Sequence, residues 1–126
     1  SKLYYYDECE QVQKILAEHT GNRGFGHNVR QLLIVASDLS SFQGVNERYQ
    51  SYIDGGMYSM SILYALHSKK IAACPLNWSV EYKVDQAFRK VTDIPDCENV
   101  IMLIAIGYPP DRFKIPCSSK KQTQLN

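Results

Sequence analysis

The sequence lacks long apolar runs, an excess of one charge and closely spaced cysteines. No stretch approaches the roughly 20 apolar residues of a membrane-spanning helix, so we expect no membrane association. The 14 Lys and Arg residues are nearly balanced by 13 Asp and Glu residues, which argues against a nucleic-acid partner. The four cysteines contain no C-x-x-C pair, which argues against a zinc site. We therefore expect no metal, and reduced thiols in a cytoplasmic protein.

A nucleotide-binding glycine motif is also missing. The stretch GNRGFGHNVR, residues 21–30, holds three glycines in the order G-x-x-G-x-G, after an expected helix and before an expected strand. A dinucleotide fingerprint has the order G-x-G-x-x-G, after a strand and before a helix. We therefore expect a helix-to-strand connection without phosphate ligands, in which Arg23 and Arg30 are surface or interface groups.

No catalytic residue can be assigned from the sequence. The three histidines are scattered, and no Ser or Cys forms a visible nucleophile pattern with them. Asp38, Glu47 and Asp54 are expected at solvated helix ends rather than in a carboxylate pair. The sequence gives a hydrolase no positive support.

Strands and helices are expected to alternate along a single domain of residues 1–126. Gly21 is expected to end the first helix, and Ser79 to cap the third one. The order predicts an α+β or α/β layer, with an extended arm over 109–126. The expected strands span 2–8, 31–39, 71–79 and 98–110, and the expected helices span 7–19, 47–70 and 79–93.

The expected helix over 47–70 has apolar residues around much of its circumference, which is more than one core face needs. Gly55 and Gly56 in its interior each cost about 1 kcal/mol relative to Ala. Their presence indicates close approach of another backbone or of a flat ligand. We predict a homodimer that packs through this helix.

Two short segments carry binding chemistry. In ACPLNWS, a strand end is followed by Pro, Asn and the only Trp, so it predicts a rigid turn whose backbone amides can bond a flat heteroaromatic ring. An ordinary turn is the alternative. In CSSKK, two hydroxyl and two ammonium groups can hold a phosphate, and a frayed basic tail is the alternative.

Taken together, these segments resemble the nitroreductase family of FMN-dependent oxidoreductases. The resemblance rests on LLIVASD, on ERYQSYIDGGMYSMSILYALHSKKIAACPLNWS and on DIPDCENVIMLIAIGYPPDRFKIPCSSKK, and runs from about Leu32 to Lys121. Family members are longer and begin with an Arg-rich motif for the FMN phosphate, which this sequence does not have. The resemblance is therefore to the C-terminal portion of the family, and we expect a fold that is incomplete at the N-terminus.

The resemblance implies an α+β sandwich with a mixed sheet flanked by helices, a homodimer, and FMN at the dimer interface. The backbone amides of Asn77 and Trp78 would lie near flavin N5 and O4. Basic groups of the arm would hold the phosphate. The implied cofactor-binding residues are Pro75, Leu76, Asn77, Trp78, Ser118, Lys120 and Lys121.

The implied reaction is a ping-pong oxidoreduction. NAD(P)H gives a hydride to flavin N5 and leaves, and a nitro compound, a quinone or a similar small-molecule acceptor then takes the electrons. The alternative is a flavin-free structural or interaction domain that keeps the fold. The missing phosphate segment favours this alternative for the chain alone, whereas the PLNW turn favours the flavin enzyme for a longer parent protein.

Overall fold

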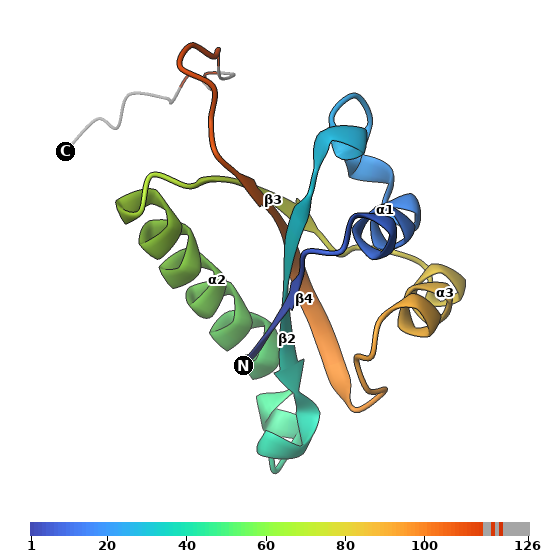
Figure 1. Ribbon diagram of the computed structural model, residues 1–126. Coiled ribbons are helices and arrows are strands. Elements are labelled where there is room, and N and C mark those ends of the chain that lie inside the picture. Colours follow the sequence, from blue (N-terminus) through green and yellow to red (C-terminus); the bar gives the residue numbers. More distant parts are fainter. Residues whose placement is uncertain (115–116, 118, 120–126) are drawn as a thin grey trace, which may run out of the picture.

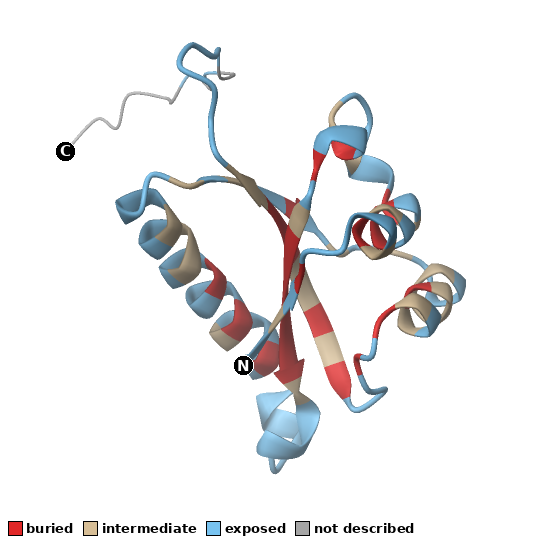
Figure 2. Ribbon diagram, in the orientation of Figure 1, coloured by how far each residue is buried: buried red, intermediate tan, exposed pale blue. Residues whose placement is uncertain are grey.

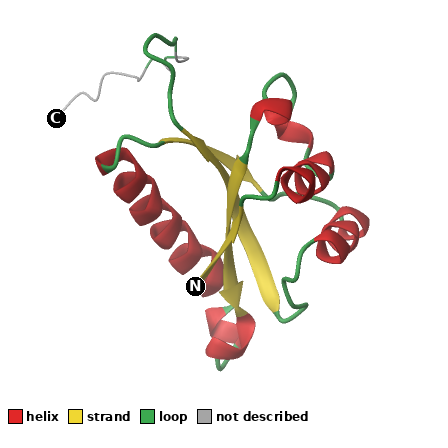
Figure 3. Cartoon of the chain, viewed as in Figure 1, coloured by secondary structure: helices red, strands yellow, loops and turns green. Residues whose placement is uncertain are grey.

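The computed structural model describes residues 1–114, 117 and 119. In this part of the chain, four strands form one sheet in the order β1-β2-β4-β3 (Figure 1, Figure 3). Helix α2 covers one face, and helices α1 and α3 cover the other. The α+β class is confirmed. The strands are β1 (Lys2–Tyr6), β2 (Gln31–Asp38), β3 (Ala72–Asn77) and β4 (Glu98–Gly107), and the helices are α1 (Cys9–Ala17), α2 (Gln50–Ser68) and α3 (Tyr82–Val91).

The four described strands pair antiparallel throughout, not as the mixed sheet that the resemblance implied. The alternation of strands and helices had left parallel pairing open. Helix α1 connects β1 to β2, and helix α3 connects β3 to β4. Each of these connections begins and ends at the same end of the sheet, so the second strand of the pair runs antiparallel to the first. The sheet is still one layer between helices, as expected for the class.

Strands β2 and β4 lie at the centre of the sheet and carry most of the core (Figure 2). Alternate residues of β2 point to opposite faces. Leu32 and Ile34 join the larger core beneath α1 and α3, which also holds Ile15, Phe88 and Leu103. The smaller core beneath α2 is built on the buried side chains of Leu33, Val35 and Ile104.

Helix α2 approaches the sheet through small residues. Ser51, Gly55 and Ser59 are buried, and they follow one another at intervals of four on the sheet-facing side. A Cβ atom added to Gly55 would lie only 2.6 Å from Cγ1 of Ile101 in β4. The sequence predicted close approach of another backbone or of a flat ligand, whereas the structure places a side chain of β4 against Gly55, and an added Cβ on Gly56 would meet nothing within 4 Å.

Two expected helix boundaries are wrong. Helix α1 ends at Ala17 with Glu18 as its C-cap, so Gly21 does not cap it and lies instead in a 3₁₀ turn (Thr20–Asn22). Helix α3 begins after Glu81, not after Ser79. The stretch 21–30 is a connection, as expected, and a second 3₁₀ turn (Gly26–Asn28) leads it into β2.

A buried carboxylate joins three strands at one end of the sheet. Glu98 is fully buried and accepts hydrogen bonds from Lys2 and, at 2.7 Å, from the Tyr4 hydroxyl. Lys2 also lies 3.4 Å from Asp38. Burial and the neighbouring Glu98 carboxylate raise the pKa of Tyr4 to about 12. The hydrogen bond to Glu98 raises the pKa of Lys2 above its usual value.

Within the described residues, no helix is both long enough and apolar enough to cross a bilayer. The division into one domain with an arm over 109–126 stays a prediction.

Candidate functional site

Strand β3 forms an edge of the sheet, since β4 is its only partner among the described strands. An edge is where a strand tolerates proline, which has no N–H to donate, and Pro75 occupies the middle of β3. Beyond β4 the chain runs on through Tyr108 and Pro109 to Phe113. This segment and β3 together border a hollow on each face of the sheet.

The hollow on the α2 face has a volume of about 860 Å³. This lies within the range of roughly 300–1,000 Å³ that is usual for ligand sites. Its walls come from the C-terminal half of α2, from β3 and from the segment after β4. They are largely apolar and include Leu63, His67, Ile71, Ala73, Pro75 and Phe113.

The hollow on the opposite face has a volume of about 460 Å³. It lies against the connection before β2, and Phe25, Cys74 and Tyr108 contribute to its walls. Both hollows are lined by Ala73 and Phe113, among others. They therefore form a continuous apolar surface around the free edge of β3.

The structure does not bring the four predicted ring-binding residues into one hollow. Pro75 lines the larger hollow, whereas the side chain of Leu76 is buried in the core and is only 6% exposed. Asn77 is exposed and lines neither hollow. Trp78 lines a third hollow of about 250 Å³, which Tyr52 of α2 also lines. The assignment of these residues to a cofactor stays a prediction.

The Trp78 side chain is held by the protein itself. Its Nε1 donates a hydrogen bond of 2.9 Å to Asp85, and its ring packs 4.2 Å from the ring centre of Phe88. Asp85 also accepts a hydrogen bond of 2.7 Å from Arg89, which in turn donates to the carbonyl of Glu98 at 2.8 Å. This network ties the connection after β3 to α3 and to the start of β4.

Sequence reasoning missed His19. This residue is only 7% exposed, and its Nδ1 accepts a hydrogen bond of 2.9 Å from the N–H of Gly21. Nδ1 is therefore unprotonated, and we assign the proton to Nε2, which donates to the carbonyl oxygen of Asn77 at 2.8 Å. The two partners are 58 residues apart, and no spacing in the sequence signals such a contact.

The predicted phosphate ligands Ser118, Lys120 and Lys121 lie outside the described residues. Among the residues that are described, no group of three or more His, Cys, Asp or Glu side chains is placed to hold a metal ion. The four cysteines are exposed and unpaired.

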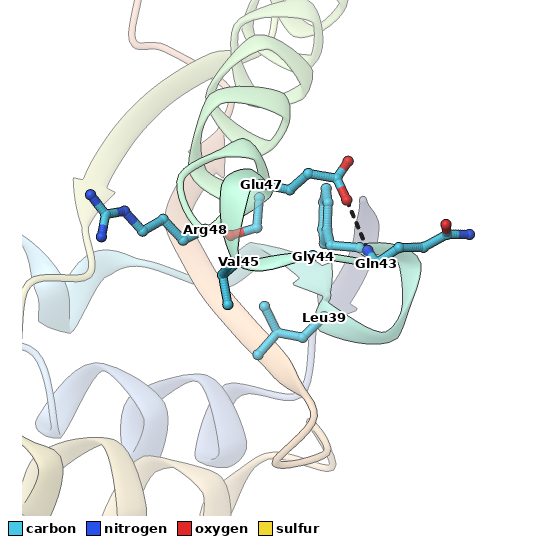
Figure 4. Close-up of a pocket in the computed structure, with 8 residues that line it drawn as sticks. Leu39, Gln43, Gly44, Val45, Glu47 and Arg48 are labelled. Carbon is cyan, nitrogen blue, oxygen red and sulfur yellow. Dashed lines mark hydrogen bonds between the residues drawn. The ribbon is translucent and has the colours of Figure 1, made fainter.

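A further hollow of about 320 Å³ lies at the N-terminus of α2 (Figure 4). Its polar groups serve the local loop, because Glu47 accepts a hydrogen bond of 2.8 Å from the backbone N–H of Gln43. Arg48 extends away from Leu39 and Val45 in Figure 4. This hollow is much smaller than the one of about 860 Å³ on the α2 face, so the edge of β3 is the better candidate.

Neither a protein-family model nor a curated protein sequence matches this chain. Solved structures do match. An FMN-dependent nitroreductase from Clostridium difficile R20291 superposes with a TM-score of 0.73 at 16% identity, over 92% of this chain and 67% of that one. A proposed NADH dehydrogenase/NAD(P)H nitroreductase from Parabacteroides distasonis ATCC 8503 superposes with a TM-score of 0.77 at 17% identity, over 99% of this chain and 70% of that one. A nitroreductase family protein from Clostridium novyi NT superposes with a TM-score of 0.70 at 16% identity, over 87% of this chain and 62% of that one. The resemblance stated from the sequence is confirmed for the fold: the described chain folds as these nitroreductase structures do.

Proposed function

We propose that the chain is the ring-binding part of an FMN-dependent NAD(P)H oxidoreductase of nitroreductase type. One observation carries the proposal: an apolar hollow of about 860 Å³ borders the free edge of β3, in a fold shared with an FMN-dependent nitroreductase. The hollow is large enough for a flat heteroaromatic ring. A nitro compound, a quinone or a similar small molecule is the proposed electron acceptor.

The residues along this edge fit a flavin ring in chemical character. Pro75, Ala73 and Phe113 offer apolar surface to the faces of a ring. The backbone amides of Asn77 and Trp78 are the proposed donors to polar ring atoms, where donors stabilise negative charge. FMN, when bound, supplies the hydride and electron transfer, while the protein binds and orients it.

A second copy of the chain is proposed to complete the site. Ile53, Met57, Met60 and Tyr64 form the outer stripe of α2, opposite the sheet, with exposures of 53%, 65%, 46% and 67%. Figure 2 shows this side of the helix as exposed. Contiguous apolar surface of this kind marks an interaction site. The large hollow adjoins the same helix, so a partner seated on the outer stripe would lie close to the ring.

The phosphate is proposed to bind Ser118, Lys120 and Lys121. A contact between a lysine and a phosphate is screened where water and salt reach it, and it then contributes little affinity. We therefore expect this chain to bind FMN weakly, and a longer parent protein with further phosphate ligands to bind it tightly. The exposed, unpaired cysteines support a reducing, cytoplasmic location.

An NMR titration tests the proposal. Millimolar FMN added to the ¹⁵N-labelled chain should shift the amide signals of Asn77 and Trp78. Ala73→Leu should reduce these shifts, because the larger side chain projects into the hollow that Ala73 lines. Ala17→Leu, at an exposed position of α1, is the matched control and should leave them unchanged. Absence of any shift in the wild type would contradict the proposal, and saturation at submicromolar FMN would show that the weak-binding account is wrong.

The alternative function is a flavin-free structural or interaction domain. One observation favours it: Asn77 and Trp78 lie outside the hollow that Pro75 lines. If this alternative holds, the chain self-associates through the outer stripe of α2 but shows no response to FMN.

A further inference from the structure

We propose that His19 is a positioning residue, which fixes the direction of the Trp78 amide by holding the carbonyl group of Asn77. The role rests on the proposed function, in which that amide faces the flavin ring. It adds a residue of the connection before β2 to a site that is otherwise built from β3 and its neighbours.

The contact is specific in chemistry and in geometry. The imidazole is almost fully buried, and both of its nitrogens are engaged: Nδ1 accepts from Gly21 at 2.9 Å and Nε2 lies 2.8 Å from the oxygen of Asn77. The bond to Gly21 fixes the tautomer, so that Nε2 is the donor. His19 therefore points a fixed N–H at one backbone carbonyl.

Holding that carbonyl orients the next amide. The peptide bond between Asn77 and Trp78 is trans, as are the other described peptide bonds. In a planar trans peptide, the C=O of one residue and the N–H of the next point in opposite directions. The hydrogen bond from His19 therefore directs the Trp78 N–H away from the imidazole, and rotation of this peptide plane would break it.

The other side of the same peptide is also fixed. The Trp78 indole is bonded to Asp85 and packs on Phe88. The His19 and Trp78 rings lie 6.2 Å apart with an angle of 23° between their planes. The plane is thus held at the carbonyl by His19 and at the side chain by α3, which is how a preorganised donor is built.

The chain leaves room for the imidazole only because residue 21 is glycine. A Cβ atom at Gly21 would lie 2.6 Å from Cε1 of His19. The ring could not keep its place beside such an atom. Gly21→Ala therefore displaces His19 without changing its chemistry, which gives a second and independent way to release the Asn77 carbonyl.

Two substitutions separate the two bonds of His19. In His19→Gln, the amide nitrogen takes the approximate place of Nε2 and can still donate to Asn77. In His19→Asn, the side-chain oxygen replaces Nδ1 and can still accept from Gly21, but the side chain is too short to reach Asn77. Both variants lose the ring, and His19→Asn also keeps the bond to Gly21 that His19→Gln loses. A larger effect in His19→Asn than in His19→Gln therefore reports the contact with the Asn77 carbonyl.

The first readout needs no flavin. We expect the ¹⁵N order parameter of the Trp78 amide to stay near the rigid value of about 0.85 in the wild type and in His19→Gln, and to fall toward about 0.6 in His19→Asn. The second readout is the FMN titration. His19→Asn should weaken FMN binding by about threefold to tenfold, the effect of one misaligned hydrogen bond, while His19→Gln should bind as the wild type does.

The outcomes distinguish this inference from the proposed function. If the wild type responds to FMN and His19→Asn responds equally, the positioning role is wrong and the proposed function stands. If FMN binding weakens as much in His19→Gln as in His19→Asn, the effect comes from the ring or from its bond to Gly21 and not from the hydrogen bond to Asn77, and the inference is also wrong. If the wild type does not respond to FMN, the proposed function fails and the flavin role of His19 fails with it. If His19→Asn does not fold, Gly21→Ala must show the same fall in the Trp78 order parameter and the same weakening of FMN binding.

Discussion

The two neighbouring glycines of α2 give a sharp test of how this helix packs. Gly55 faces the sheet, and an added Cβ would lie 2.6, 3.0 and 3.1 Å from three side-chain carbons of Ile101. Gly56 is exposed, and an added Cβ would meet nothing within 4 Å. We predict that Gly56→Ala stabilises the chain and that Gly55→Ala is clearly less stable than Gly56→Ala.

The magnitude follows from two terms. Both substitutions gain about 1 kcal/mol of helix propensity, because Ala replaces Gly inside a helix. Only Gly55→Ala also overpacks the interface, which typically costs about 1–3 kcal/mol. Rotation of the Ile101 side chain does not relieve the clash. Both of its γ carbons lie near the added Cβ, and any staggered rotamer leaves a γ carbon in at least one of these two positions. The difference between the variants should therefore be about 1–3 kcal/mol, with Gly56→Ala the more stable.

Chemical denaturation of the two variants measures this difference directly. The shared propensity gain cancels, provided that the dependence of the unfolding free energy on denaturant is the same in both. Equal stabilities would refute the close approach of α2 to β4. The measurement should be repeated over a range of protein concentrations, because Gly56 lies on the exposed side of α2 and a partner chain could contact it.

A double-mutant cycle identifies the atoms responsible. Ile101→Ala removes all three carbons that a methyl group added at Gly55 would meet. The cost of Gly55→Ala should then disappear in the Ile101→Ala background, giving a coupling of about 1 kcal/mol or more. An unchanged cost would mean that the methyl group clashes elsewhere.

Three further predictions concern other parts of the chain. The raised pKa of Tyr4, about 12 against an ordinary value of 10.0, means that its neutral hydroxyl stabilises the fold below about pH 10 and that this contribution is lost as the pH rises toward 12. The difference in unfolding free energy between wild type and Tyr4→Phe should therefore shrink over this interval, and a constant difference would contradict it. Met57→Lys should convert a dimer into a monomer by light scattering at micromolar concentration, while Asn46→Lys, at an exposed position off the stripe, should not; a monomeric wild type would rule out the dimer. Arg23→Ala should change FMN affinity of the parent protein by no more than a few-fold, and a tenfold loss, about 1.4 kcal/mol, would show that the connection holds phosphate.

Much of the fold could be predicted from local sequence patterns. The apolar run QLLIVASD and the run from Glu98 to Gly107 became the two central strands, because a strand covered on both faces needs apolar residues at every position. The boundaries at Gly21 and Ser79 failed for a different reason. A glycine or a serine near a helix end has several uses, and here Gly21 serves the ring of His19 instead of a helix terminus.

The candidate site was less predictable, because its contacts join distant parts of the chain. The PLNW segment was visible as a short motif, but it is not the predicted turn, because Pro75, Leu76 and Asn77 belong to β3. Its geometry depends on His19 before it and on Asp85 after it. Neither residue carries a signal of its own, since a buried histidine and a helical aspartate have many ordinary roles. Composition and spacing can mark a turn, but they cannot say which side chains hold it.

Helix α2 shows how a sequence pattern can predict a surface outside the core. Large apolar residues recur around much of the helix, and only some of them, such as Leu63 and Leu66, pack against the sheet. Ser51, Gly55 and Ser59 also face the sheet, while Met57 and Tyr64 are 65% and 67% exposed. Small residues let the helix axis approach the sheet closely and leave the large ones on the outside, where burying them requires another surface. The apolar periodicity that predicted the helix therefore also predicts an exposed apolar stripe on its outer side. This stripe is the physical reason to expect a second copy of the chain beside the proposed flavin site.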